Sequence, residues 1–268
     1  MPADACLGGY REWRLDGQSG LSCEAVWIYE AGDNPVAHRL LPDGKPSLAI
    51  RLRRDRQGDA TGCDLIISGG LTRASWYRPA ARETMIGLRL YPEAAQAAAA
   101  LDPREFSNGV HEAPRLLVQH FARLLGEAPL MHSEAVARAL TDGLQTIRPG
   151  FEHELQHRAA AGIRASAGRV SIAGLAKHLG IGDRQLRRRF EQATGMTPKQ
   201  YGRLLRHLNA IRLAETVPRP DWAGIAVEAG YADQSHMIRE ARALSAESPA
   251  RLHAERRAES EMSNTIAA

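Results

Sequence analysis

The chain contains Ser171-Ile-Ala-Gly-Leu-Ala-Lys-His-Leu-Gly-Ile-Gly-Asp-Arg-Gln-Leu-Arg-Arg-Arg-Phe190, followed by Gly195-Met-Thr-Pro198. Fifty residues further on begins a similar segment, Asp221-Trp-Ala-Gly-Ile-Ala-Val-Glu-Ala-Gly-Tyr-Ala-Asp-Gln-Ser-His-Met-Ile-Arg-Glu-Ala241, followed by Ala246-Glu-Ser-Pro249. Leu175 corresponds to Ile225 at an offset of 50 residues, whereas Leu186 corresponds to Met237 at 51, so the second turn has one extra residue. A helix, a glycine turn and a second helix, present twice, predict two helix-turn-helix units.

The first unit has the residues expected at the ends of two short helices. Ser171 is a suitable N-cap, and Gly180 can take the left-handed conformation that ends a helix. Asp183 is expected to cap the second helix. The expected buried positions are Ile172, Leu175, Ala176 and Leu179 in the first helix, and Leu186, Phe190 and Ala193 in the second.

The second helix of this unit is basic on its outer face. That face carries Arg184, Gln185, Arg187, Arg188 and Glu191. Arginines at i, i+3 and i+4 share one side of a helix, and Arg recognises guanine O6 and N7 with two hydrogen bonds. A solvated basic face is the alternative for an isolated Arg run, but its place directly after a helix and a glycine turn favours DNA reading. A third helix from Thr197-Pro198 through Leu213 would separate the two units.

Basic charge is concentrated in the same part of the chain. Residues 163–257 carry 17 Lys and Arg against 9 Asp and Glu, whereas residues 1–162 carry 18 against 20. The net charge of +4 for all 268 residues therefore hides a basic C-terminal part. Such a concentration of basic residues is typical of proteins that bind a partner rich in phosphates.

The rest of the composition predicts a soluble cytoplasmic protein. Cys6, Cys23 and Cys63 show no pairing pattern, which fits free thiols in a reducing compartment. The chain has no run of about 18 apolar residues and no basic-apolar leader, so we expect neither membrane association nor export.

The N-terminal half predicts strands and then helices. Short apolar segments at 25–29, 47–52, 64–67 and 84–90 are separated by turn formers, which suggests a sandwich or small barrel over residues 10–91. Helical patterns follow at 93–101, 114–125 and 133–147. Ala159-Ala-Ala-Gly162 and Ala165-Ser-Ala-Gly168 are interpreted as a connector. We thus expect an α+β fold, with a β-rich sensor or dimerisation domain at 1–160, a seven-helix DNA-binding domain at 163–257 and a flexible tail at 258–268.

The C-terminal segment resembles the DNA-binding domain of the AraC/XylS transcription regulators. The resemblance is carried by Ile-Ala-x-x-Leu-Gly, the Arg-rich helix ending in Arg189-Phe190, Gly195-Met-Thr-Pro-x-x-Tyr201, Arg206-x-x-x-Ala210-x-x-Leu213 and Ala229-Gly-Tyr-x-Asp-Gln-Ser-His236. It implies base contacts by Arg184, Arg187, Arg188, Gln234, Ser235, His236 and Arg239. It also implies phosphate contacts by Ser171, Ile172 and Lys199.

The second unit departs from the family pattern. Met237 and Ala241 stand where the family has two phenylalanines, Ala246 replaces a glycine, and Leu252 replaces a tyrosine. An aromatic-to-alanine change implies a smaller core or a compensating partner. A regulator whose second unit binds protein instead of DNA is therefore kept as an alternative.

The N-terminal half resembles the cupin-like sensor domain of a bacterial AraC subgroup. Tyr10-Arg-Glu12, Ala25-Val-Trp27, Leu41-Pro-Asp-Gly44 and the segment from Gly87 to Ala95 carry this resemblance. It implies an effector-responsive regulator, with double-stranded DNA as partner and a small-molecule effector, RNA polymerase and a second copy of the chain as further partners. Trp27, Tyr29, Arg51 and Trp76 are candidates for an effector pocket, with core packing as the competing role of the aromatic ones.

An enzyme is the rival from another class. His153-Glu154-x-x-His157 matches the His-Glu-x-x-His pattern in which two histidines bind zinc and the glutamate is a general base. The pattern is short, and Ile163 stands at the position of a third histidine in its extended form. We therefore expect no enzyme, no metal site and no cofactor, with a zinc-dependent hydrolase as the alternative.

Overall fold

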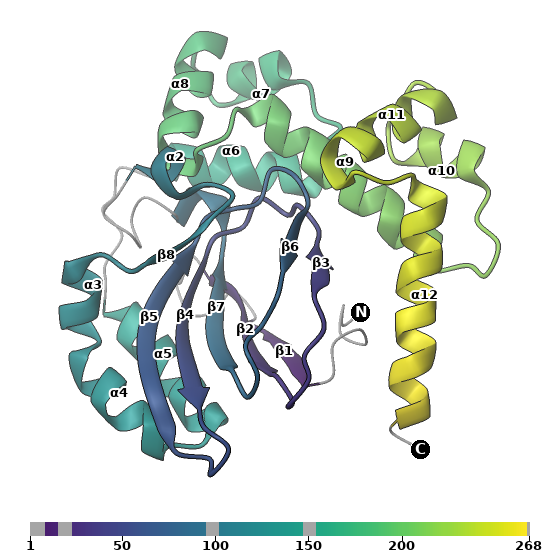
Figure 1. The fold of residues 1–268 in the computed structure, drawn as a ribbon. Helices are drawn as coiled ribbons and strands as arrows, with labels where there is room; N and C mark the ends of the chain where they lie inside the picture. Colours follow the sequence, from purple (N-terminus) through teal and green to yellow (C-terminus); the bar gives the residue numbers. More distant parts are fainter. Residues whose placement is uncertain (1–8, 16–22, 95–101, 147–153, 267–268) are drawn as a thin grey trace.

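A computed structural model describes residues 9–15, 23–94, 102–146 and 154–266 (Figure 1). The N-terminal part is built on a six-stranded antiparallel sheet with the strand order β1-β2-β7-β4-β5-β8. Its strands are β1 (Tyr10–Arg14), β2 (Cys23–Glu30), β4 (Ser47–Arg54), β5 (Ala60–Ser68), β7 (Thr84–Leu90) and β8 (Val110–Glu112). The four apolar segments expected as strands are therefore confirmed as β2, β4, β5 and β7.

One face of this sheet is covered by helices. Side chains alternate between the two faces of a strand, so Leu48, Ile50 and Leu52 of β4 all lie in the buried core on the helical side. The helices there are α3 (Arg115–His120), α4 (Ala122–Glu127), the short turn η3 (Ala128–Leu130) and α5 (Ser133–Gln145). The expected helix at 114–125 is thus divided at Phe121, while the one from Ser133 is confirmed; the pattern at 95–101 lies outside the described residues.

The opposite face of the sheet is turned toward a small ribbon of two strands. Here β3 (His38–Leu40) pairs with β6 (Ser75–Tyr77), and the pair stands in front of the sheet (Figure 1). We call this pair the β3–β6 ribbon. Two short elements, η2 (Pro92–Ala94) and α2 (Pro103–Phe106), lead toward the C-terminal helices. The expected β-rich domain with a helical extension is confirmed.

The C-terminal part is entirely helical. It comprises α6 (Glu154–Ala165), α7 (Ile172–His178), α8 (Asp183–Thr194), α9 (Pro198–Glu215), α10 (Trp222–Glu228), α11 (Gln234–Ser245) and α12 (Pro249–Ile266). Helices α7 and α8 form the first helix-turn-helix, α10 and α11 the second, and α9 joins them (Figure 1). Both expected units are confirmed, as is the α+β class.

The termini of the first unit differ from expectation at one residue. The Ser171 hydroxyl caps α7 by accepting from the Gly174 N–H, and Gly180 is left-handed with φ of 70°. Asp183, however, does not cap α8, because the N-cap is Gly182 and no side chain caps this end. Asp183 is the first residue of the helix, where its carboxylate pairs with Arg187 at 3.0 Å.

The expected connector around 159–168 is wrong in its first part. Ala159, Ala160 and Ile163 belong to α6 and are fully buried among α7, α8 and α9. The small residues there serve close packing, since a Cβ on Gly162 would stand 3.0 Å from Leu175 Cδ1. Alanine is also the best helix former, so the composition that suggested a linker suits a tightly packed helix.

Two further features concern the C-terminal end. The expected flexible tail begins at residue 258, but α12 continues as a helix to Ile266 through a segment rich in helix-forming residues. Among the helices of the described ranges, none has the length and apolarity needed to cross a bilayer.

Candidate DNA interface and sensor cavity

The first recognition helix, α8, presents its basic residues to solvent. Leu186, Phe190 and Ala193 are fully buried and fix the inner face, as expected. Arg184, Arg187 and Arg188 are consequently exposed on the outer face. Of these, Arg187 is partly occupied by its ion pair with Asp183. The arrangement leaves Arg184 and Arg188 available for an external hydrogen-bond acceptor.

The second recognition helix, α11, begins at the cap Asp233, whose carboxylate accepts from the His236 N–H at 2.6 Å. Gln234, Ser235 and Arg239 are exposed, in agreement with a role at a surface. His236 is only half-exposed, and its ring lies edge-on against Tyr231 at 5.4 Å. The structure thus gives His236 a packing contact, and the readily available groups of α11 are the other three.

The expected phosphate contacts lie at helix N-termini. Ser171 precedes α7 and is exposed, Ile172 opens that helix, and Lys199 is exposed in the first turn of α9. The start of α9 is fixed by a capping box between Thr197 and Gln200. Free N–H groups at such ends favour anions.

The small core of the second unit matches its departures from the family pattern. Met237 and Ala241 are fully buried, and the surrounding cluster contains several alanines with Tyr231. Ala246 ends α11 in the left-handed conformation, with φ of 59°, where an alanine is strained and a glycine is not.

The N-terminal domain holds the C-terminal end of α8. Helix α8 packs against η2 and α2. A Cβ on the left-handed Gly195 would stand 3.1 Å from the carbonyl oxygen of Pro103, so only a glycine fits at this approach. Gly44 of the N-terminal domain similarly lies against the Met196 side chain.

The same domain also holds the C-terminal end of α11, through the β3–β6 ribbon. Arg39 of β3 donates from Nη1 to the Ser245 carbonyl oxygen at 2.9 Å. The Ala74 N–H donates to the Leu244 carbonyl oxygen at 2.6 Å. The last carbonyls of a helix have no partner within it, so these bonds act as an external C-cap. Both recognition helices are thus held at their C-terminal ends, and their N-terminal halves stay exposed.

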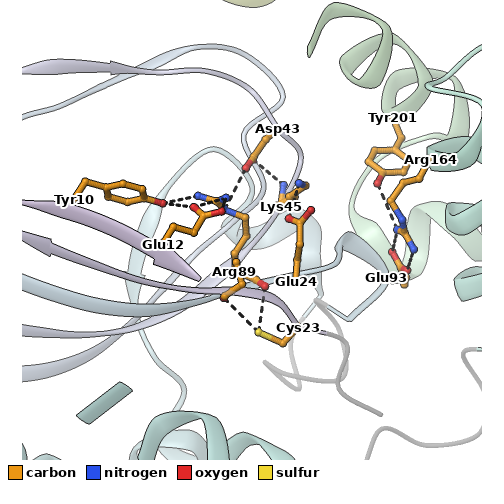
Figure 2. A network of polar contacts seen from close by, with 11 residues as sticks. Tyr10, Glu12, Cys23, Glu24, Asp43, Lys45, Arg89, Glu93, Arg164 and Tyr201 are labelled. Atoms are coloured by element: carbon orange, nitrogen blue, oxygen red, sulfur yellow. Dashed lines mark hydrogen bonds and ion pairs between the residues drawn. The ribbon is translucent and has the colours of Figure 1, made fainter. Parts of the chain in front are cut away.

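A buried ion pair joins the two parts of the chain. Glu93 of η2 is 3 % exposed and accepts from both terminal nitrogens of Arg164 at 2.8 and 2.9 Å (Figure 2). Burial raises the pKa of Glu93, but hydrogen bonds from His157 and Arg164 outweigh this effect and leave its pKa below the ordinary value. The hydrogen bond to Glu93 in turn raises the pKa of His157, against the opposing effect of burial.

The contact between His157 and Glu93 involves one of the two histidines that the zinc alternative requires. His157 Nδ1 lies 3.2 Å from Glu93 Oε1, so that nitrogen is engaged in the ion-pair cluster. His153 lies outside the described residues. Among the residues that the structure describes, no group of three His, Cys, Asp or Glu side chains is arranged to hold a metal ion.

A cavity of about 400 Å³ lies between the sheet and the β3–β6 ribbon. Trp27 and Tyr29 of β2 and Trp76 of β6, three of the four candidates for an effector pocket, line this cavity. Arg51 does not line this cavity; it pairs with Asp64 at 3.2 Å on the neighbouring strand. Arg256 of α12 lines the cavity as well, so the cavity also touches the C-terminal helices.

Arg39, Glu93 and Arg89 were not identified from the sequence. Each makes hydrogen bonds or ion pairs with a residue far along the chain, as Arg39 does with Ser245. Glu93 stood in a segment whose alanines indicated only a helix, and Arg89 alternates with apolar residues in β7 like any surface arginine. Only the register of the strands could have indicated that Arg89 faces the cavity.

Comparison with known proteins gives two family matches. Residues 175–255 match the model of a helix-turn-helix domain, and residues 22–112 match a domain of unknown function, DUF6597. No curated protein matches the chain.

Several solved structures are similar. A transcriptional regulator with an AraC-type DNA-binding domain from Chromobacterium violaceum is 24 % identical over 38 % of this chain and 91 % of its own, with a TM-score of 0.36. ToxT from Vibrio cholerae O395 is 10 % identical over 92 % of this chain and 98 % of its own, with a TM-score of 0.45. ToxT from strain SCE256, bound to an unsaturated fatty acid, is 11 % identical over 85 % and 94 %, with a TM-score of 0.41.

The match at 175–255, the two helix-turn-helix units and the basic face of α8 define a DNA-binding protein. The chain is a transcription regulator with a helix-turn-helix DNA-binding domain at residues 175–255, preceded by a β-rich domain that matches DUF6597 over residues 22–112.

Proposed function

We propose that this regulator binds DNA with α8 and α11 in successive major-groove segments, and that the N-terminal domain sets the position of both helices in response to a small-molecule effector. The observation that carries the proposal is the hold of the N-terminal domain on the C-terminal ends of both recognition helices. Residues near the N-terminus of a recognition helix contact bases, so this hold leaves the reading surfaces free.

The side chains divide by role. Arg184 and Arg188 of α8, with Gln234, Ser235 and Arg239 of α11, are exposed and contact base edges. Arg187 contributes when its ion pair with Asp183 opens. The N–H groups at Ser171 and Ile172, together with Lys199, bind phosphates, which supply affinity but no sequence preference.

The effector acts through the β3–β6 ribbon. Its residues line the cavity on one side, and Arg39 and Ala74 bond to the last carbonyls of α11 on the other. A ligand that shifts the ribbon therefore shifts the second recognition helix relative to the first. A ligand changes an equilibrium only by its differential affinity for the two arrangements, and a ribbon in contact with both ligand and helix provides that difference.

The proposal is tested by selecting duplexes from a random pool with the full-length protein in the cytoplasmic range of salt. Enrichment of two half-sites about 10 base pairs apart supports two readers. In the variant Arg239→Ala, the half-site of α11 should lose its sequence preference while that of α8 remains. A single enriched half-site, unchanged in this variant, would instead indicate that the second unit binds a protein.

A further inference from the structure

We propose that the sensor cavity binds an uncharged, largely aromatic molecule and excludes organic acids. This inference rests on the proposed function only for the ligand's role as effector; the binding preference itself follows from the cavity. Three observations carry it: a flat aromatic floor, aromatic walls and cationic groups that already have acidic partners.

The floor is made by Trp27 lying against a glycine. In the sheet, Trp27 of β2 is opposite Gly87 of β7, which is itself opposite Ala49 of β4. A Cβ on Gly87 would stand 2.3 Å from Trp27 Cζ2, so the indole occupies the space that a side chain would fill. The Tyr10 ring stacks beside it at 6.3 Å between centroids. Gly87 and Ala49 are small and thus leave space above the centre of the sheet. The rings of Trp27 and Tyr10 line this space.

The walls are aromatic and apolar as well. The His38 ring contacts the rings of both Tyr29 and Tyr77, and Met85 and Leu71 add further apolar surface. A cavity of about 400 Å³ with such walls suits a planar apolar ligand of modest size.

Arg89, one of the cations that line the cavity, has protein partners for its whole guanidinium group (Figure 2). Its Nη1 pairs with Glu12 at 2.8 Å, its Nη2 donates to the Tyr10 hydroxyl at 2.9 Å, and its Nε faces Asp43 at 3.9 Å. Every nitrogen of this guanidinium therefore has a partner from the protein. An arginine binds a ligand carboxylate most strongly when two of its nitrogens are directed at the ligand.

The other cations that line the cavity are also paired within the described residues. Lys45 contacts Glu24 at 2.5 Å, and both side chains are about five-sixths buried. Arg39 pairs with Glu255 at 3.7 Å and Arg256 pairs with Glu215. The acidic side chains of the lining, Glu12 and Asp43, face Arg89 in turn.

At the floor, an ionic ligand would therefore have to compete with the shielded ion pairs of Arg89 and Lys45 to gain a partner. The loss of a partner leaves an uncompensated charge away from water, so this exchange is unfavourable for acids and for amines. An uncharged aromatic molecule meets no such obstacle, because it mainly replaces water on apolar surface.

The test uses two fluorescent probes that share one ring system, the uncharged N-phenyl-1-naphthylamine and the anionic 8-anilino-1-naphthalenesulfonate. Each is titrated into the full-length protein, and the dissociation constants are compared. We expect the uncharged probe to bind at least about tenfold more tightly. The variant Ala49→Phe fills the cavity and should abolish this binding, with thermal unfolding used to check that it folds.

Glu12→Gln is the informative second variant. It frees Arg89 while keeping a hydrogen-bonding side chain, so the anionic probe should gain about tenfold in affinity. Glu112→Gln changes the net charge equally at an exposed site of β8 outside the cavity lining and should leave both affinities unchanged.

Equal or tighter binding of the anionic probe by the natural chain would overturn the proposal. A failure of the uncharged probe to bind, or binding of that probe to Ala49→Phe, would overturn it as well. If the protein still binds its selected duplexes, these outcomes refute only the ligand preference and not the DNA-binding function. Loss of specific DNA binding with the probe preference intact would refute the proposed function alone.

Discussion

Arg39, on a strand of the N-terminal domain, donates a hydrogen bond to the carbonyl oxygen of Ser245, the last residue of the second recognition helix, at 2.9 Å. The two residues are 206 positions apart in the chain. The Arg39 side chain also lies over the Trp76 ring, with its Cζ 5.3 Å from the centroid, so the ribbon and the helix end form one packed unit. The Arg39 side chain thus lines the cavity and also contacts the C-terminal end of α11.

Replacing this side chain should loosen the end of α11. In Arg39→Ala, we expect the amides of the last turn of α11 to exchange about tenfold faster, because a charge-assisted hydrogen bond contributes about 1.5–3 kcal/mol. Hydrogen exchange followed by mass spectrometry measures this, with α8 as internal reference. Arg53→Ala, which removes an ion pair with Asp64 elsewhere in the sheet, is the matched control. Unchanged exchange in α11 would show that the ribbon does not hold this helix.

Two substitutions at the DNA surface should separate sequence choice from affinity. Arg188→Ala is expected to weaken operator binding by about 1–3 kcal/mol and to relax the preference at one position. Lys199→Ala should weaken binding to operator and random duplexes alike, and reduce the log–log salt slope by about 1. Fluorescence anisotropy across a salt series measures both. If the two variants behave alike on both duplexes, the assignment of roles is wrong.

Ala246 offers a test of strain at the end of α11. Ala246→Gly should stabilise the protein by about 0.5–1 kcal/mol, because the left-handed conformation costs alanine more than the added freedom of the unfolded chain costs glycine. Thermal unfolding measures the change. Ala243→Gly, at an exposed position inside the same helix, should have the opposite sign and destabilise by about 1 kcal/mol. Destabilisation by both variants would show that the backbone at Ala246 is not strained.

His207 makes the contact between α9 and α11 sensitive to acid. Its ring is 1 % exposed, its Nε2 lies 2.6 Å from the Ser245 hydroxyl, and burial lowers its pKa to about 4, an effect opposed by the carboxylate of Glu240. Between the ordinary pKa of about 6.5 and the folded value, the unfolded chain binds a proton that the folded chain does not. Stability must therefore fall as the pH falls through this window.

The expected loss from this residue between pH 7 and pH 5 is about 2 kcal/mol. Urea unfolding of the natural chain and of His207→Gln at both pH values measures it, and the difference between the two proteins cancels the contributions of other groups such as His157. A loss of equal size in His207→Gln would mean that another group is responsible.

The sequence predicted those parts of the structure that depend on local pattern. Short apolar segments indicated β4 and β7, and the order of cap, apolar face and glycine turn indicated α7 and α8. The residues expected on the inner faces of these two helices are buried, except that Ile172 and Leu179 are only partly buried. The basic outer face of α8 followed directly from helical spacing, because three turns of one helix need no information about distant residues.

Three features were not predicted, and two of them depended on distant partners. The alanines of α6 suggested a linker, because their burial depends on how closely α7 and α9 approach. Asp183 suggested a cap, yet Gly182 takes the extended conformation of the N-cap and Asp183 begins the helix. The contact of Arg39 with Ser245 joins residues without any shared pattern, so only the folded chain shows it.

In the proposed complex, both α8 and α11 lie in the major groove. Methylation interference on a selected duplex measures this most directly, because modification of guanine N7 blocks contacts in that groove. We expect two clusters of interfering guanines about 10 base pairs apart on one face of the DNA, with only one of them lost in Arg239→Ala. A single cluster that Arg239→Ala leaves unchanged, while Arg188→Ala removes it, would contradict the claim.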